Sequence, residues 1–280
     1  MMHGDEKSDP AKVAMKPANK VERSAAEQAE PRAGAEGNAG ERNTFRAQNR
    51  GDVSQSLDRV RQAAKLRKKE KLTTLLHHVS VDALHEAFHA LKPKAAAGVD
   101  GVTWEEYEAH LEPRLQDLHA RIHRGAYRPQ PARRVYIPKA DGKMRPLAVA
   151  ALEDKIAQGA VAMVLSAIYE EEFLGFSYGF RPGRGPHDAL DALAMAITTR
   201  KVSFIVDADI RSFFDTVNHD WLIRFLEHRI GDKRIIRLIQ KWLKAGVLEN
   251  GSVTVSGSGT GQGAVITPRT QKITFDLSAP

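Results

Sequence analysis

The stretch Asp207-Ala-Asp-Ile-Arg-Ser-Phe-Phe-Asp215 follows directly after Lys201-Val-Ser-Phe-Ile-Val206, a short run of β-branched and aromatic residues. Such a run predicts a β-strand over 201–207. Alternate residues of a strand share a face, so Asp207 and Asp209 would emerge together at its end. Paired carboxylates repel unless a cation neutralises them, and Mg²⁺ prefers such oxygen ligands. The spacing alone leaves two interpretations open: a magnesium site, or one aspartate that caps the next turn beside a solvated one.

The composition around this stretch bounds the class of protein. The chain has 280 residues with 42 Lys and Arg against 35 Asp and Glu, a net charge of +7, and no cysteine. The absence of cysteine excludes disulfide scaffolds, Cys-ligated zinc, iron–sulfur clusters and thiol catalysis. The charged N-terminus and the short longest apolar stretch, 159–169, predict no secretory signal and no membrane helix. We therefore expect a cytoplasmic protein, with association with the nucleoid as an option, and the basic excess is compatible with a nucleic-acid partner.

The N-terminal part divides into two stretches of different composition. Residues 1–55 are rich in Ala, Glu, Lys, Arg and Gly without apolar periodicity, which predicts a disordered tail. From Leu57 to Val79 apolar residues recur at helical spacing beside a cluster of cations, which predicts a basic amphipathic helix. This cluster is either a solvated helix face or a contact with an RNA backbone, because clustered Lys and Arg displace phosphate counterions. Its residues are Arg61, Lys65, Arg67, Lys68 and Lys69.

Further along the chain, helices and strands alternate without a regular βαβ rhythm, which predicts an α+β fold. Ser80 and Asn218 stand where helix N-caps belong, and an Asp-Gly pair at 141–142 between strand-like residues predicts a hairpin. We expect Trp221 to be buried in the helix that Asn218 caps. The predicted helices are 80–92, 105–122, 152–173, 218–230 and a last one that ends at Gly246, and the predicted strands are 133–138 and 201–207.

Six sequence blocks then occur in a characteristic order. They are Ala-Gly-Val-Asp-Gly-Val-Thr at 97–103, Ile-Pro-Lys-Ala-Asp-Gly-Lys-Met-Arg-Pro-Leu at 137–147, Asp-Lys-Ile-Ala-Gln at 154–158, Phe-Ser-Tyr-Gly-Phe-Arg-Pro-Gly-Arg at 176–184, the 207–215 stretch, and Gly-Thr-Gly-Gln-Gly-Ala-Val-Ile-Thr-Pro at 259–268. With these blocks the chain, over roughly 84–268, resembles the reverse transcriptase domain of group II intron-encoded proteins. The resemblance implies the fingers and a partial palm of a right-hand polymerase. It divides the chain into an N-terminal extension with fingers at 56–200, a partial palm at 201–268 and a tail outside the family at 269–280.

The resemblance also implies roles for individual residues. Asp209 would be a catalytic ligand of a two-Mg²⁺ site, with the backbone carbonyl of Ile210 as a further ligand. Lys143 and Arg145 would hold the incoming triphosphate, and their alternative is a solvated hairpin. Phe214 would crowd a ribose 2′-hydroxyl and so favour dNTPs, and its alternative is plain core packing.

Three more residues follow from the same resemblance. Gln262 matches the glutamine of the family's Pro-Gln-Gly turn beside the nascent base pair. Arg181 and Arg184 would contact the template backbone, or they belong to a solvated turn. The implied partners are a group II intron RNA, a DNA primer and dNTPs.

The chain departs from the family pattern after Pro268. The apolar Leu-Leu-Ala-Asn helix and the Tyr-Ala-Asp-Asp turn, which supplies two further catalytic carboxylates, do not follow, and no Asp-Asp pair occurs in the sequence. Gly261 also stands in place of the family's proline. We therefore expect an RNA-directed DNA polymerase domain that is truncated and inactive alone. The alternatives are a non-catalytic, maturase-like RNA-binding fragment, or a product that does not fold.

Overall fold

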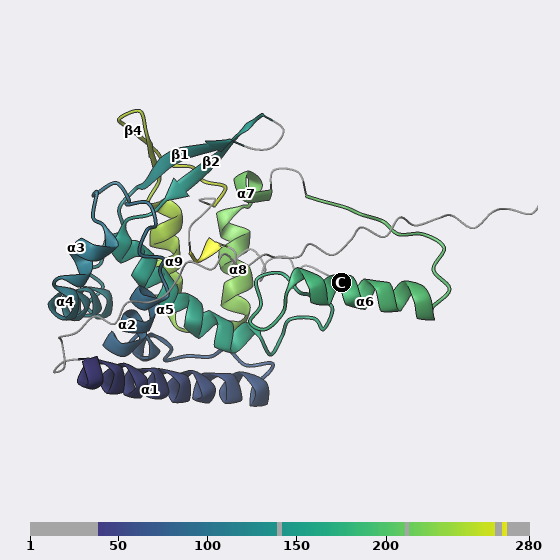
Figure 1. Ribbon diagram of the computed structural model, residues 1–280, viewed down its shortest axis with the longest axis horizontal. Helices are drawn as coiled ribbons and strands as arrows, with labels where there is room; N and C mark the ends of the chain where they lie inside the picture. The colour runs from purple at the N-terminus through teal and green to yellow at the C-terminus, as the bar shows by residue number, and fades with distance from the viewer. Residues whose placement is uncertain (1–38, 139–141, 211–212, 261–264, 268–280) are drawn as a thin grey trace, which may run out of the picture. The chain divides into compact units, whose positions relative to one another are not determined.

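The computed structural model describes residues 39–138, 142–210, 213–260 and 265–267 (Figure 1). The chain divides into a first unit, 1–41, and a second unit, 42–280, and the second carries the fold. Helices and strands are mixed, as the α+β prediction requires. The elements are α1 (Ala39–Leu66), the 3₁₀ turn η1 (Leu76–His78), α2 (Val81–His89), α3 (Trp104–Glu108), α4 (Leu111–His123), β1 (Ala132–Pro138), β2 (Met144–Val149), α5 (Leu152–Tyr169), α6 (Pro186–Thr199), α7 (Phe213–Thr216), α8 (His219–Arg229), α9 (Lys233–Lys244), β3 (Val247–Glu249) and β4 (Ser252–Thr254).

A small sheet joins segments that are far apart in the sequence. Its strand order is β2-β1-β3-β4. β1 and β2 form the antiparallel hairpin predicted around Asp141-Gly142, with Ile137 opposite Arg145, and Gly142 has the positive φ of 78° that the turn favours. β3 pairs with β1 in parallel and with β4 in antiparallel orientation. The hairpin is thereby fixed to the segment that follows α9.

Helix α5 forms the centre of the hydrophobic core. Its apolar residues are buried almost all round, including Ile156, Val161, Leu165 and Ile168, which is typical of a helix enclosed by others. Buried residues of α2, α4, α8 and α9 belong to the same core cluster, and Figure 1 shows α5 between them. None of the helices in the described ranges is long and apolar enough to cross a membrane.

The predicted helix caps are confirmed by hydrogen bonds. Ser80 Oγ accepts from the amide of Ala83 at 3.1 Å, and Asn218 Oδ1 accepts from the amide of Trp221 at 3.0 Å. Gly246, with φ of 78°, follows the end of α9. The helix expected over 105–122 is broken into α3 and α4, and α3 begins with a capping box between Thr103 and Glu106.

The strand prediction for 201–207 is wrong. Residues 201–210 are extended and exposed but belong to no ladder, with Phe204 88% and Val206 85% exposed. A strand is stable only beside another strand that completes its hydrogen bonds, and no described strand lies along this segment. Trp221, expected to be buried, is 56% exposed. The sequence reasoning also missed α6, which begins with Pro186 and has no buried residue.

The N-terminal predictions are corrected in part. Residues 1–38 and 268–280 lie outside the described residues, but 39–55 of the predicted tail are helical. Val53, Val60 and Ala64 of α1 are buried, so this helix packs on the core. Ser56 Oγ lies 2.6 Å from His78 Nδ1, and burial, together with the neighbouring side chains of His77 and Arg59, lowers the pKa of His78 to about 4. His78 is therefore neutral at pH 7 and can share this hydrogen bond.

Candidate functional site

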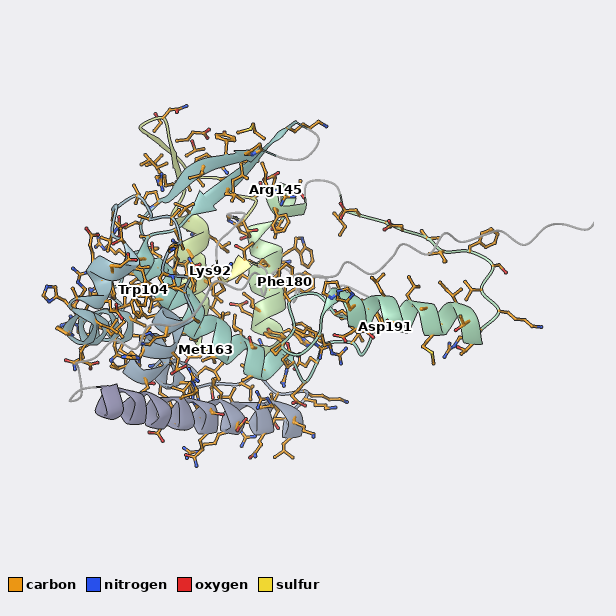
Figure 2. The ribbon with its side chains drawn as sticks, viewed as in Figure 1. Lys92, Trp104, Arg145, Met163, Phe180 and Asp191 are labelled. Carbon is orange, nitrogen blue, oxygen red and sulfur yellow. The ribbon has the colours of Figure 1, made fainter. Side chains whose placement is uncertain are left out.

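The β1–β2 hairpin carries the two residues predicted to hold a triphosphate. Lys143 and Arg145 are both exposed, the first just before β2 and the second within it (Arg145 is labelled in Figure 2). At the base of the hairpin, Arg134 of β1 lies 3.6 Å from Glu249 of β3. The hairpin thus presents two cations to solvent from a base held by the sheet.

Phe214 lies where the 258–260 segment meets α7. The amide of Thr260 donates to the carbonyl of Phe214 at 2.7 Å, and the amide of Gly259 donates to the carbonyl of Val217 at 2.8 Å. Gly259 has φ of 85°, and a Cβ there would lie 3.0 Å from the carbonyl oxygen of Asp215. Glycine therefore allows this close approach of two backbones. Gln262, predicted to lie beside the base pair, falls outside the described residues.

A cavity of about 310 Å³ lies beside Phe214. Residues of β1, β2, α5, α9 and the 254–260 segment line it, and so do Ile266 and Thr267. Asp207 and Asp209 do not line it. The structure therefore brings Phe214 and the glycine-rich segment together at a cavity of ligand-sized volume, but it does not bring Asp209 there.

The floor of this cavity holds a buried polar network that the sequence reasoning missed. Tyr127 Oη donates to Asp154, and the amide of Gln130 donates to Asp154 Oδ2 at 2.9 Å. Burial raises the pKa of Asp154 to about 6, although both hydrogen bonds act in the opposite direction. Gln158, one turn later on α5, is buried with its Oε1 unpaired within the described residues. The available signal was the position of Asp154 and Gln158, four residues apart on a helix whose other buried residues are apolar or aromatic.

Asp209 and Ile210 lie in the exposed extended segment between α6 and α7. Asp207 lies two residues earlier and is exposed as well. Within the part of the chain that the structure describes, no three His, Asp or Glu side chains gather into a possible metal site. The two carboxylates could supply oxygen ligands to one hard cation, but they do not form the ligand set of a two-cation site.

Arg181 and Arg184 hold their own loop together. Arg181 Nε donates to Glu170 Oε2 at 2.9 Å, and its Nη1 donates to the carbonyls of Leu174 and Ser177. Arg184 Nη1 donates to the carbonyls of Gly175 and Ser177. The side chain of Arg181 is almost fully buried. A contact with template therefore stays a prediction for both residues, and the structure gives them internal partners instead.

The basic helix predicted from Leu57 to Val79 ends at Leu66. Of the residues predicted to contact RNA, Arg61 and Lys65 lie in the last turns of α1, and the other three follow it. Lys65, Arg67, Lys68 and Lys69 are exposed, and Arg61, also exposed, pairs with Asp58 on the same helix.

The backbone beneath these cations is fixed by Arg229, which is only 1% exposed. Its guanidinium pairs with Glu172 and donates to the carbonyls of Ala64, Arg67 and Glu70. The main chain of this segment is therefore held by hydrogen bonds to Arg229, while the side chains of Lys65 and of the cations at 67–69 are exposed.

The Ala-Gly-Val-Asp-Gly block packs against the start of α5. A Cβ on Gly98 would lie 2.4 Å from the Cα of Ala151, so only glycine fits. Lys155 Nζ donates to the carbonyl of Ala96 and Arg133 Nη2 to the carbonyl of Ala97, each at 2.7 Å. Five of the six sequence blocks are thus connected through α5, the hairpin and the cavity: those at 97–103, 137–147, 154–158 and 207–215, and the one at 259–268 through its described residues Gly259 and Thr260.

Comparisons with known proteins identify the family of the chain. A family model described as reverse transcriptase (RNA-dependent DNA polymerase) matches residues 137–277, half of the chain. The chain is 41% identical over 174 residues to protein YkfC of Escherichia coli (strain K12), an alignment that covers 61% of this chain and 46% of YkfC. It is 35% identical over 188 residues to the group II intron-encoded protein LtrA of Lactococcus lactis subsp. cremoris, covering 67% of this chain and 31% of LtrA.

The chain thus spans less than half the length of these curated relatives. A solved structure, the partial Cas6-RT-Cas1--Cas2 complex, matches with a TM-score of 0.47 and 21% identity over 73% of this chain and 34% of that chain, a likeness too low to bear on function. The family match and the similarity to LtrA point to the same family. The chain belongs to the reverse transcriptase family, and its relatives include group II intron-encoded proteins.

Proposed function

We propose that this chain supplies the fingers and part of the palm of an RNA-directed DNA polymerase of the group II intron type. The observation that carries the proposal is the 2.7 Å hydrogen bond from the amide of Thr260 to the carbonyl of Phe214, which fixes two family blocks beside one cavity. The family match and the similarity to LtrA support it. The substrates would be dNTPs and a primer paired to an RNA template.

The exposed cations of the hairpin suit the first task of such an enzyme, which is to hold a triphosphate. Arg145 offers a planar fork of donors to phosphate oxygens, and Lys143 adds a point charge. Both stand on the same arm of a hairpin fixed by the sheet. The half-buried ring of Phe214 beside the cavity would exclude a 2′-hydroxyl by its bulk.

Divalent cations would bind at the carboxylates and stabilise the charge that develops during nucleotidyl transfer. Asp209 and Asp207 are the acidic residues available for this in the described extended segment. The resemblance assigns the other carboxylates to a Tyr-Ala-Asp-Asp turn that the sequence does not contain. We therefore expect this chain by itself to extend a primer weakly or not at all.

The test is primer extension with purified protein, an RNA template, a DNA primer, dNTPs and Mg²⁺. The polymerase proposal predicts that any extension is lost in Asp209→Asn and retained in the matched control Asp220→Asn, an exposed aspartate in the first turn of α8. If extension occurs and survives Asp209→Asn, the assigned role of Asp209 is wrong. Phe214→Ala should raise the incorporation of ribonucleotides wherever extension is measurable.

A second candidate function is RNA binding without catalysis. The exposed cations at 65–69 on a backbone fixed by Arg229 favour it. This function predicts RNA affinity that falls steeply with salt and does not change in Asp209→Asn. Salt-dependent binding without extension would therefore support the second function over the first.

A further inference from the structure

The cavity beside Phe214 has two buried oxygen acceptors on one face of α5. Asp154 is 3% exposed and Gln158 is 4% exposed, and both line the cavity. Residues four apart on a helix are neighbours on its surface, with about 5–6 Å between their Cβ atoms. A ligand that enters the cavity therefore meets both side chains together.

The side-chain oxygen of Gln158 lacks a hydrogen-bond partner. Gln158 Oε1 is enclosed by the protein and accepts no hydrogen bond from any described residue. A buried acceptor without a donor destabilises the fold, and such groups are rare in native proteins unless a water or a ligand completes them. This oxygen therefore indicates a missing donor inside the cavity.

The carboxylate of Asp154 has hydrogen bonds but no cation. Tyr127 Oη and the amide of Gln130 donate to it, and it forms no ion pair within the part of the chain that the structure describes. The side chains of Glu153 and Asp100, whose charges also act on its pKa, are acidic. With a pKa of about 6 the carboxyl is mainly ionised at pH 7. A buried carboxylate without a cation is costly, and a cation in the cavity would lower that cost.

The other charged residues that line the cavity leave it net negative. Arg134 lies 3.6 Å from Glu249, which offsets its charge, and Asp215 is exposed and adds a second negative charge. The buried Nε of Arg134 makes no hydrogen bond, so an oxygen atom on a ligand would find a donor there. The net charge disfavours a triphosphate, and neither Lys143 nor Arg145 lines the cavity. The cavity is therefore suited to a ligand other than the nucleotide.

The walls of the cavity are apolar and aromatic. Ala148, Ile239 and Leu243 contribute aliphatic surface, and Phe214 and Trp242 contribute rings, which attract cations that lie over their faces. The volume is about 310 Å³, whereas an engineered protein cavity of about 150 Å³ is enough to hold benzene. The space therefore suits a single ring, or an alkyl chain, that carries a polar group.

We propose that this cavity binds a small organic cation with an amidinium or guanidinium group and an apolar body. The planar cation has several N–H donors, so it can donate to the carboxylate of Asp154 and to Gln158 Oε1 at once, while its body fills the apolar walls. A metal ion fits less well, because no three His, Asp or Glu side chains gather within the described ranges. Asp209 does not line the cavity, and the inference does not rest on the proposed polymerase function.

The test is isothermal titration of the full chain at pH 7.5 with benzamidine and with phenylguanidine. Benzamide is the matched control ligand, because it has nearly the shape of benzamidine without its charge. Benzamidine should bind saturably with one site per chain, and benzamide should bind at least about tenfold more weakly. Equal affinities for benzamidine and benzamide would overturn the assignment of a cation site. Absence of saturable binding by both cations would overturn the proposal, and ordered water would then account for Gln158 Oε1.

Two substitutions remove one acceptor each. Asp154→Asn keeps the volume and removes the charge, and Gln158→Leu removes the neutral acceptor. Each should weaken benzamidine binding at least about tenfold, because a hydrogen bond to the cation is lost. Asp154→Asn should also reduce the preference for benzamidine over benzamide, which a loss of stability alone would not do. The exposed counterparts Asp220→Asn and Gln116→Leu should bind as the unchanged protein does.

A third substitution fills the cavity and leaves both acceptors in place. Ala148→Leu, on the wall formed by β2, should abolish binding by occupying the space, whereas Ala95→Leu at an exposed position should not. Urea unfolding shows which variants are folded, and Ala148→Leu still decides the question if Asp154→Asn does not fold. Unchanged benzamidine affinity in the folded variants would place the ligand elsewhere and overturn the proposal. Asp209→Asn should bind benzamidine normally, so failure of the polymerase proposal would not affect this result.

Discussion

The buried guanidinium of Arg229 connects three parts of the fold, and its removal should destabilise the protein strongly. It pairs with Glu172 from the turn after α5 and donates to the carbonyls of Ala64 and Arg67 at the end of α1. Methionine at this position would fill a similar volume but leave Glu172, whose side chain is only 16% exposed, without its cation. Breaking a buried ion pair in this way costs about 3–5 kcal/mol. We therefore expect Arg229→Met to lower the free energy of unfolding by that amount.

The assay is urea unfolding at pH 7 followed by circular dichroism. Arg224→Met is the matched control on the same helix, because Arg224 is exposed and its guanidinium only covers the Trp221 ring at 5.0 Å. This control should cost no more than about 0.5–1 kcal/mol. Arg229→Lys, which keeps the charge but not the fork of donors, should fall between the two. A loss below about 1 kcal/mol in Arg229→Met would refute the reasoning.

Three further predictions use the same assay. Gly98→Ala should cost several kcal/mol, or prevent folding, because its Cβ would overlap the backbone of Ala151, whereas Gly51→Ala, with open space around it on α1, should not destabilise. Asn218→Ala should cost about 1 kcal/mol through loss of the α8 cap, and Asn218→Asp should be nearly neutral. The pKa of Asp154 is raised to about 6 in the folded protein, so the protonated carboxyl stabilises the fold below about pH 4, and this stabilisation is lost as the pH rises through 6. Between these pH values the free energy of unfolding of the unchanged protein should fall, relative to that of Asp154→Asn, by on the order of 2–3 kcal/mol. A difference between the two proteins that does not change with pH would contradict the shift.

Features that depend on neighbouring residues in the sequence were predictable. The N-caps Ser80 and Asn218 and the hairpin around Asp141-Gly142 each rest on a local pattern whose partners lie within a few residues. The order of sequence blocks likewise needs no structure. For these features the local signal already contains the interaction that stabilises them.

Features that depend on distant partners were not predictable. The 201–207 run has the composition of a strand, but composition cannot say whether another strand lies beside it. Arg181 looked like a surface cation in a glycine-rich loop, and only the fold shows its bonds to Glu170 and to loop carbonyls.

The exposed segment between α6 and α7 also has a consequence for limited proteolysis. Arg200 and Lys201 lie at its start, in extended backbone that can enter a protease cleft without local unfolding (Figure 1). Trypsin should cut there first. The strands and helices after the cut remain joined to those before it through the β1–β3 pairing and the shared core. The nicked protein should therefore give two fragments on a denaturing gel and a single peak in gel filtration.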